Sequence, residues 1–273
     1  MSMNIIFIFF VGAAIGSFLN VLIDRLPRGE QVLRGRSYCD HCHHKLAWPD
    51  LIPLVSFLSL LGRCRYCRFH ISWQNPLVEF TTGLLFLSTF IFLKEEILAK
   101  SILLGSMELL AVFFLISCLI VIFFTDLHYQ IIPDQIVYPA ILISLIYNFI
   151  FHFSTPALNR FGTGPAGGFI FHLAASLTSV AFFLFLVMIT RGKGMGMGDV
   201  KLVGLMGLFL GFPKIVVALY FAFLTGALAG VILILVRKKK IGQTIPFGPF
   251  LVVGTWVALF LGDMIIAWWQ KFV

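Results

Sequence analysis

The sequence predicts an all-α polytopic membrane protein of about eight transmembrane helices, with a small cytoplasmic zinc-binding loop module built on four cysteines. Three observations predict this fold class. Hydrophobic residues make up 60% of the 273 positions and charged residues 12%, whereas a soluble domain carries about 25% charge. Several apolar runs reach the roughly 20 residues that a helix needs to cross a hydrocarbon core of about 30 Å. Two Cys-x-x-Cys pairs stand in the one long loop.

The apolar runs divide the chain into its expected helices. These lie at residues 4–22, 77–93, 103–125, 134–152, 167–190, 199–211, 213–236 and 247–269. The first run has no basic residue ahead of it and no cleavage site after it, so we expect a retained helix rather than a removed signal peptide. The sixth helix is short and is followed at once by a turn at Pro213, so we expect a half-helix or a tilted helix.

The basic residues predict the orientation of the chain in the membrane. The net charge is +8, and Lys and Arg gather in short loops beside the apolar runs, which indicates a topology signal rather than nucleic-acid binding. One side of the membrane receives about three basic residues for each one on the other side, so it is cytoplasmic by the positive-inside rule. The basic run at 237–240 is expected to be a stop-transfer anchor that also touches anionic lipid, with a substrate-binding role as the alternative. The loops expected on the cytoplasmic side are 23–75, 126–133, 191–198 and 237–246.

The cysteines of the long loop predict a metal site. Two thiolates in a Cys-x-x-Cys turn can grip one ion, and two such turns close a tetrahedron around Zn²⁺. A cytoplasmic loop keeps its thiols reduced, and about 50 residues are too few for much of a core, so structural zinc would supply the missing stability. A redox dithiol pair and an iron–sulfur site are the competing interpretations. The expected metal ligands are Cys39, Cys42, Cys64 and Cys67.

The other residues of metal-binding type are not expected to be ligands. Four thiolates already close the site, so the nearby histidines His41, His43 and His44 are expected to be solvated bystanders. Cys118 stands alone in an apolar run and is expected to pack inside the protein.

Two aspartates are the candidate catalytic residues. Asp126 ends the third expected helix and Asp199 begins the sixth, so both are expected at the cytoplasmic edge although they are far apart in the sequence. Charged groups at membrane depth are costly and mark function. Two facing carboxylates share one proton, which suits the activation of water against a peptide carbonyl. The glycines at 194–198 would permit close backbone approach or positive φ beside Asp199. Helix capping by Asp199 and a simple span end at Asp126 are the alternatives.

Further polar residues are expected near this edge. Asp134 follows Pro133 and is expected to cap the fourth helix, with support of the aspartate pair as the second interpretation. Glu79 lies inside an apolar helix, so it is expected to be paired or to line a polar cavity. Asn20 continues the first helix to the cytoplasmic surface, and Gly12-x-x-x-Gly16 on the same helix is expected to serve close helix packing.

Six short motifs in order resemble the type IV prepilin peptidases, with their relatives in type II secretion and competence systems. The resemblance spans nearly the whole chain. The motifs are Gly16-Ser-Phe-Leu-Asn20 through Pro27, the paired Cys-x-x-Cys loop, Pro76-Leu-Val-Glu79 with Gly83, Thr125-Asp126 through Pro133-Asp134, Gly196-Met-Gly198-Asp199-Val-Lys201, and Pro246-Phe-Gly248-Pro249-Phe250.

The resemblance implies a GxGD-type aspartic protease of the bacterial inner membrane, with Asp126 and Asp199 as its catalytic pair. It implies prepilin or pseudopilin substrates, cut on the cytoplasmic side after a Gly that commonly precedes Phe. It also implies N-methylation of the new terminus by S-adenosylmethionine, because the four-cysteine loop accompanies the bifunctional members. The sequence contains no recognisable methyl-donor motif. The residues expected to support the site are Asn20, Glu79, Pro133, Asp134, Gly196, Gly198 and Lys201.

The expected domains are a first transmembrane helix at 1–22, a cytoplasmic zinc-binding module at 23–75 linked to methyl transfer, and a transmembrane aspartic peptidase core at 76–273. Two other functions are considered. A proton- or cation-coupled transporter would carry polar residues deep in several helices, whereas here the middle of most spans is apolar. A membrane-tethered zinc module that binds a partner would use an aromatic loop face such as Tyr38, Trp48, Tyr66 and Trp73, but eight spans are excessive for an anchor.

Overall fold

The computed structural model describes residues 2–32, 35, 37–99, 101–153, 168–192, 194–236 and 245–271. The predicted lipid-contacting run at 237–240 lies outside the described residues. By its contacts the chain forms two compact units, Met1–Val121 and Ile122–Val273, with the boundary inside one helix.

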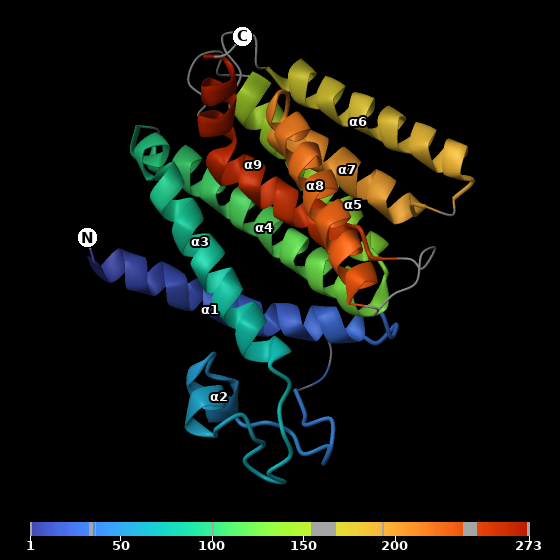
Figure 1. Ribbon diagram of the computed structural model, residues 1–273. Helices are drawn as coiled ribbons and strands as arrows, with labels where there is room; N and C mark the ends of the chain where they lie inside the picture. Colours follow the sequence, from blue (N-terminus) through green and yellow to red (C-terminus); the bar gives the residue numbers. More distant parts are fainter. Residues whose placement is uncertain are drawn as a thin grey trace. The chain divides into compact units, whose positions relative to one another are not determined.

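All eight expected helices are present in the described part of the chain, which confirms the helical membrane fold (Figure 1). Seven of them are long and apolar enough to cross a membrane. Two short elements, η1 (Trp48–Leu51) and α2 (Val55–Ser59), lie in the long loop. The long helices are α1 (Ser2–Arg25), α3 (Gln74–Ala99), α4 (Ile102–Tyr129), α5 (Asp134–Phe153), α6 (Phe169–Thr190), α7 (Met197–Leu210), α8 (Lys214–Leu235) and α9 (Gly248–Trp269).

In the first unit, α1 packs closely against α3. A Cβ atom added at Gly12 would lie 2.8 Å from the Cα of Gly83, and one added at Gly16 would lie 2.8 Å from the Cα of Glu79. No side chain fits between backbones that approach this closely, which confirms the packing role predicted for the Gly-x-x-x-Gly spacing. The rings of Phe86 and Phe113 stack with centroids 4.0 Å apart and join α3 to α4.

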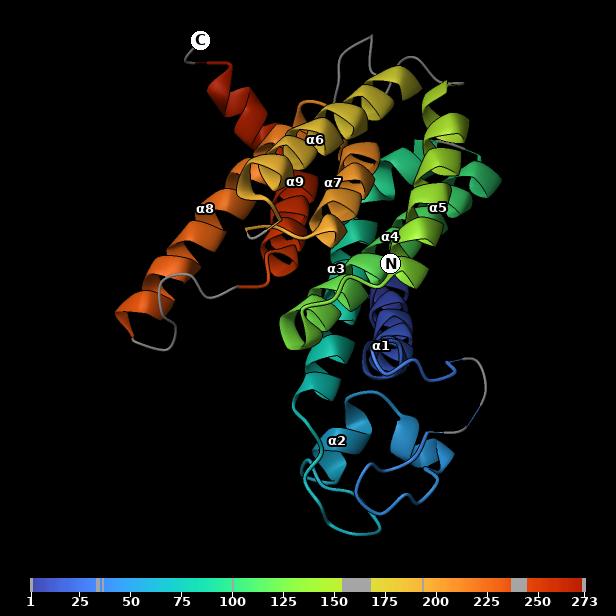
Figure 2. The same ribbon diagram turned by 90° about the vertical axis from the view of Figure 1, so that its right-hand side faces the viewer.

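In the second unit, the short helix α7 lies at the centre of the packing, against α5, α6 and α9; α6 and α7 run side by side in both views (Figure 1, Figure 2). Its 14 residues extend about 21 Å, less than the roughly 30 Å of a hydrocarbon core. From Asp199 to Leu210 every residue except Lys201 is buried. The half-helix interpretation is therefore the better one, because a short helix is tolerated at membrane depth where protein surrounds it.

Polar side chains that were not predicted as site residues form hydrogen bonds to the buried end of α7. The last carbonyls of a helix have no partner within it. Asn148 donates its Nδ2–H to the carbonyl oxygen of Leu208 at 2.8 Å, and Nδ1 of His172 lies 2.8 Å from the same oxygen. Lys214 begins α8 with no exposed surface and pairs with Asp263 of α9 at 2.8 Å. α8 begins directly after α7 ends and leads back toward the side from which α7 entered. The predicted side of the loops before α7 and after α8 is therefore the same whether or not α7 crosses the whole membrane.

Candidate active site and metal centre

Asp126 lies in the last turn of α4 rather than at its end. The helix continues to Tyr129, beyond the expected end at 125, and stops where Gln130 takes a left-handed φ of 56°. The Asp126 side chain is buried, with the residue 5% exposed. Its Oδ2 atom accepts the backbone N–H of Gly248 at 2.9 Å.

Gly248 is the first residue of α9, so Asp126 sits against the N-terminus of that helix. The first N–H groups of a helix lack internal partners, and the helix dipole favours negative charge there. A Cβ atom at Gly248 would lie 2.6 Å from Oδ2 of Asp126. Only glycine therefore permits this approach. Gly248 belongs to the closing motif of the sequence but was not among the predicted site residues. Its position at the start of an apolar helix is the feature that could have identified it.

Asp199 is held in an equivalent way at the start of α7. It is the third residue of the helix, is 8% exposed, and its Oδ2 atom accepts the N–H of Gly196 at 3.1 Å. This is one half of a capping box, since glycine has no side chain to return the bond. The Asp199 carboxylate thus caps the start of α7, as the alternative interpretation expected. This role does not conflict with a catalytic one, because a cap also fixes the position of the carboxylate.

Asp126 and Asp199 both lie in the second unit, and the charge of Asp126 acts on the Asp199 carboxyl group. Both residues are buried, so both carboxylates have lost most of their water. Two buried carboxylates whose charges interact hold one proton between them more readily than two charges. The pair can therefore offer one acid and one base to a substrate.

The glycines before Asp199 act through close approach. Gly196 has a φ of −87°, so it does not use the left-handed region. A Cβ atom at Gly198 would lie 3.1 Å from Cβ of Ile132, in the segment between α4 and α5. The glycine at 198 thus lets the start of α7 pack against the segment that follows Asp126.

The predicted supporting residues of the second unit lie beside this contact. Pro133 is buried and precedes α5, which begins at Asp134 as expected. Lys201 donates to Oδ1 of Asp134 at 2.6 Å and lies over the ring of Tyr138 at 5.2 Å. This ion pair joins the start of α5 to the start of α7. This bond fits the second interpretation of Asp134, support near the aspartate pair, which stays a prediction.

Glu79 and Asn20 belong to the first unit. Glu79 is 8% exposed and its Oε2 atom accepts the N–H of Leu54 at 2.7 Å, so it is paired with the long loop as one of the two expectations had it. Asn20 donates to the carbonyl oxygens of Gly16 at 3.3 Å and Asn75 at 3.1 Å.

The four loop cysteines form one cluster. Their sulfur atoms all lie within 4.8 Å of one another, and those of Cys39 and Cys67 are 3.8 Å apart. A tetrahedral zinc ion with Zn–S bonds of about 2.3 Å requires sulfurs about 3.8 Å apart. The residues therefore fit a metal ion, and zinc is compatible with the all-thiolate donor set.

The two cysteine turns repeat each other in backbone geometry. In the first, the N–H of Cys39 donates to the carbonyl of His44 at 3.0 Å; in the second, the N–H of Cys64 donates to that of Phe69 at 2.8 Å. His43 and Arg68 take the matching left-handed φ values of 54° and 60°. Such turns point both thiols of a pair and several N–H groups toward one centre.

The thiol of Cys64 is favoured in its metal-binding form. Burial raises the pKa of Cys64, but hydrogen bonds to its sulfur from the N–H groups of Cys67 and Tyr66 outweigh it and lower the pKa to about 7. Thiolate is the form that binds metal. His41 stacks on Phe69 with centroids 4.3 Å apart, so it is a bystander that packs rather than a purely solvated one. Cys118 is buried in α4, as predicted.

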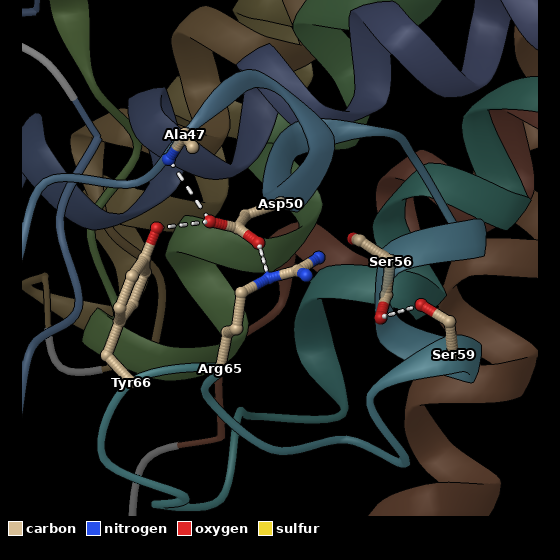
Figure 3. A network of polar contacts seen from close by, with 6 residues as sticks. All are labelled: Ala47, Asp50, Ser56, Ser59, Arg65 and Tyr66. Carbon is tan, nitrogen blue, oxygen red and sulfur yellow. Dashed lines mark hydrogen bonds and ion pairs between the residues drawn. The ribbon is translucent and has the colours of Figure 1, made fainter.

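A carboxylate joins the two halves of the module (Figure 3). The side chain of Asp50 is 4% exposed and accepts hydrogen bonds from Arg65 Nε at 2.6 Å, Tyr66 Oη at 3.1 Å and the N–H of Ala47 at 3.1 Å. Burial would raise the pKa of Asp50, but these bonds, that from Arg65 first, hold it below its usual value. Asp50 thereby ties η1 to the second cysteine turn.

Known proteins resemble the chain from end to end. The model of the bacterial peptidase A24 N-terminal domain matches residues 10–93, and that of the type IV leader peptidase family matches 113–231. Proteins named prepilin leader peptidase/N-methyltransferase are similar in Bacillus subtilis, at 33% identity over 98% of both chains, and in Aeromonas hydrophila, at 32% over 96% of this chain and 92% of that one.

The chain belongs to the type IV leader peptidase family. It is thus a member of a family of aspartic peptidases. The protein named prepilin leader peptidase/N-methyltransferase from Pseudomonas aeruginosa is 32% identical over 96% of this chain. No solved structure matches the chain significantly. Family membership together with the seven apolar helices makes the chain a multi-pass protein of the inner membrane.

Proposed function

We propose that the chain removes the basic leader from type IV prepilins or pseudopilins and then N-methylates the new terminus. Asp126 and Asp199 are the proposed catalytic pair. The observation that carries this proposal is their arrangement: two buried carboxylates, each held at a helix N-terminus by a glycine N–H, within reach of each other's charge. The membership in a peptidase family favours this function over a transporter.

The proposed reaction needs only these two side chains and water. The ionised carboxylate takes a proton from water, whose oxygen attacks the carbonyl carbon of the scissile peptide, while the protonated carboxyl gives its proton to the carbonyl oxygen. The tetrahedral intermediate then collapses. The C–N bond breaks, the leaving nitrogen takes a proton from the pair, and the products are a leader carboxylate and a free amine.

The proposed cleavage follows a glycine at the cytoplasmic face. The distribution of basic loop residues supports that face, and the substrate's own apolar helix can stay in the bilayer while the leader junction reaches the membrane edge. The leader is basic, so Asp24, Glu79, Asp134 or anionic lipid is proposed to attract it. Of these, the Asp134 side chain is 55% exposed and so is available to a substrate.

The second proposed activity is methyl transfer from S-adenosylmethionine. It rests on the names of the relatives and on the complete set of four cysteines. We propose a structural zinc ion for these cysteines, since a closed site of four thiolates has no open position for a substrate. In this proposal the module at 23–75 serves methylation and the core at 76–273 serves cleavage.

A synthetic prepilin segment tests the proposal. It would carry a basic leader, Gly and Phe at the junction, and an apolar helix, and would be incubated with the purified full-length protein in detergent. Mass spectrometry should find a cut after the Gly, and an added methyl group on the Phe when S-adenosylmethionine is present. A matched segment with Leu in place of the Gly should stay intact. A transporter would cut neither segment, and that result would overturn the proposal.

A further inference from the structure

One segment of the cysteine module exposes apolar side chains without any charge among them. Residues 51–62 contain no Asp, Glu, Lys or Arg. Val55 is 50% exposed, Leu58 70% and Leu61 85%. Water-soluble surfaces rarely gather large apolar side chains in this way, and such patches mark contact with protein or membrane.

The local fold fixes this exposure, because the side chain of Phe57, also on α2, packs inside the module and holds the segment in place. Phe57 is 7% exposed and packs edge-on against Trp73, with ring centroids 5.0 Å apart. The ring also lies where a Cβ atom at Gly62 would meet it at 3.0 Å. Phe57 therefore faces inward while Leu58 and Leu61 face away from the module.

A hydrogen bond places the segment at the depth of a membrane-spanning helix. The N–H of Leu54 donates to Glu79 Oε2 at 2.7 Å. Glu79 is in the second turn of the candidate span Gln74–Glu95, about 7 Å along the helix from its first residue. In both views α2 lies on the half of the module nearer to α1 and α3 (Figure 1, Figure 2). The start of the apolar segment is thus joined directly to α3.

The flanking residues suit the boundary between lipid and water. Trp73 directly precedes α3 and is 77% exposed, and Trp is enriched at membrane interfaces. The basic residues Arg63, Arg65 and Arg68 follow the uncharged segment at once. An apolar stretch edged by Trp and Arg is the pattern of a segment that lies in the interface and attracts anionic headgroups.

We propose that residues 51–62 form an interfacial anchor, which inserts Val55, Leu58 and Leu61 among lipid acyl chains and so holds the cysteine module against the bilayer. The occupant of the patch is lipid rather than a second protein. The anchor is independent of the catalytic pair, since it depends on the first unit alone. It fixes the module at the membrane plane even though its backbone is tethered only through α1 and α3.

Photocrosslinking in a bilayer tests this anchor. The full-length protein would be reconstituted in nanodiscs of zwitterionic and anionic lipid, with benzoylphenylalanine placed singly at Leu58 or Leu61. Leu84, 46% exposed in the middle of α3, provides the matched lipid-facing position. Lys45, exposed on the first cysteine turn, provides the matched water-facing position. Metal content of each variant checks that the module has kept its fold.

The expected result is lipid-mass adducts at positions 58, 61 and 84 and none at 45. Three results would overturn the anchor. The first is no lipid adduct at 58 and 61 while 84 forms one. The second is an adduct of twice the protein mass, which would make the patch an interface between copies. The third is adduct formation with an added prepilin segment only, which would make the patch a substrate surface.

Discussion

The contact between Gly248 and Asp126 predicts a large effect from the smallest possible substitution. In Gly248→Ala the new Cβ atom would lie 2.6 Å from Oδ2 and 3.1 Å from Cγ of the Asp126 carboxylate. Separations under about 3 Å are repulsive, so the carboxylate or the start of α9 has to move. Either movement breaks the hydrogen bond of 2.9 Å that now positions Asp126.

The expected loss can be estimated from this bond. A hydrogen bond to a charged group contributes about 1.5–3 kcal/mol. Since about 1.4 kcal/mol in a barrier is tenfold in rate, its loss slows cleavage by about 10- to 100-fold. A displacement of about 1 Å in a catalytic group costs a similar factor, about 100-fold, so the two routes agree on the upper end of the range.

The assay is the initial rate of leader cleavage by purified Gly248→Ala, with thermal unfolding measured on the same preparation. Gly230→Ala is the matched control, because its Cβ atom on α8 would meet only Ile245 Cδ1, at an ordinary contact distance of 3.8 Å. The control should cleave normally. If Gly248→Ala also cleaved at the normal rate, or slowed only in proportion to protein unfolded, Asp126 would not depend on the start of α9.

Three further predictions concern the module and the supporting ion pair. Purified protein should contain about one zinc ion per chain by elemental analysis, and Cys39→Ser should lower both the metal content and the unfolding temperature. A Cys39→Ser variant with unchanged metal content and unchanged unfolding temperature would exclude a metal centre at these cysteines. Asp50 has a lowered pKa in the folded module, so its stabilising effect is present near neutral pH and is lost as the pH falls through that lowered value; Asp50→Asn should be less stable than the unsubstituted protein at pH 7, and the difference should shrink in acid. If the difference in stability between the two proteins stayed constant with pH, the lowered pKa of Asp50 would not be the source of its stabilising effect. Lys201→Asp or Asp134→Lys should slow cleavage and should cost at most about 1 kcal/mol of stability, because both side chains are partly exposed. The double variant reverses the ion pair and should recover part of the cleavage rate. No recovery in the double variant would show that the ion pair does not support the site.

The fold could be predicted because membrane helices are set by composition over a long window. A span must be apolar along about 20 residues, and no tertiary contact overrides that requirement. The ends were less predictable. The expected third helix ended at 125, whereas α4 continues to Tyr129 because Gln130, a residue with no special sequence mark, takes the left-handed turn.

The short helix α7 shows what the sequence leaves open. Its length was visible, but its buried end depends on polar partners from two other helices, Asn148 and His172, and Asp263 pairs with Lys214 at the start of α8. In the sequence, a polar residue within an apolar helix is explained equally well by a span end or by a local hydrogen bond. Only the packing shows that they meet the end of α7 and the start of α8.

The candidate site was predictable in its residue types and less so in its supports. The Cys-x-x-Cys spacing alone predicted the four cysteines as metal ligands, and the expected position at the membrane edge indicated Asp126 and Asp199 as catalytic candidates. The partner of Glu79 was not predictable, because it is a backbone N–H of the long loop, and any residue could carry that group. Gly248 was missed as a site residue for the same reason, since it acts through its N–H and its lack of a side chain.

The central claim is that Asp126 and Asp199 act as one catalytic unit, and the rates of Asp126→Asn, Asp199→Asn and the double variant test it most directly. Each single substitution removes a proton-transfer group and should slow leader cleavage by at least about 100-fold. Groups that act as a unit are non-additive, so the double variant should be about as slow as the slower single variant. A normal rate in either single variant, or a double variant slower by the product of the two single effects, would contradict the claim.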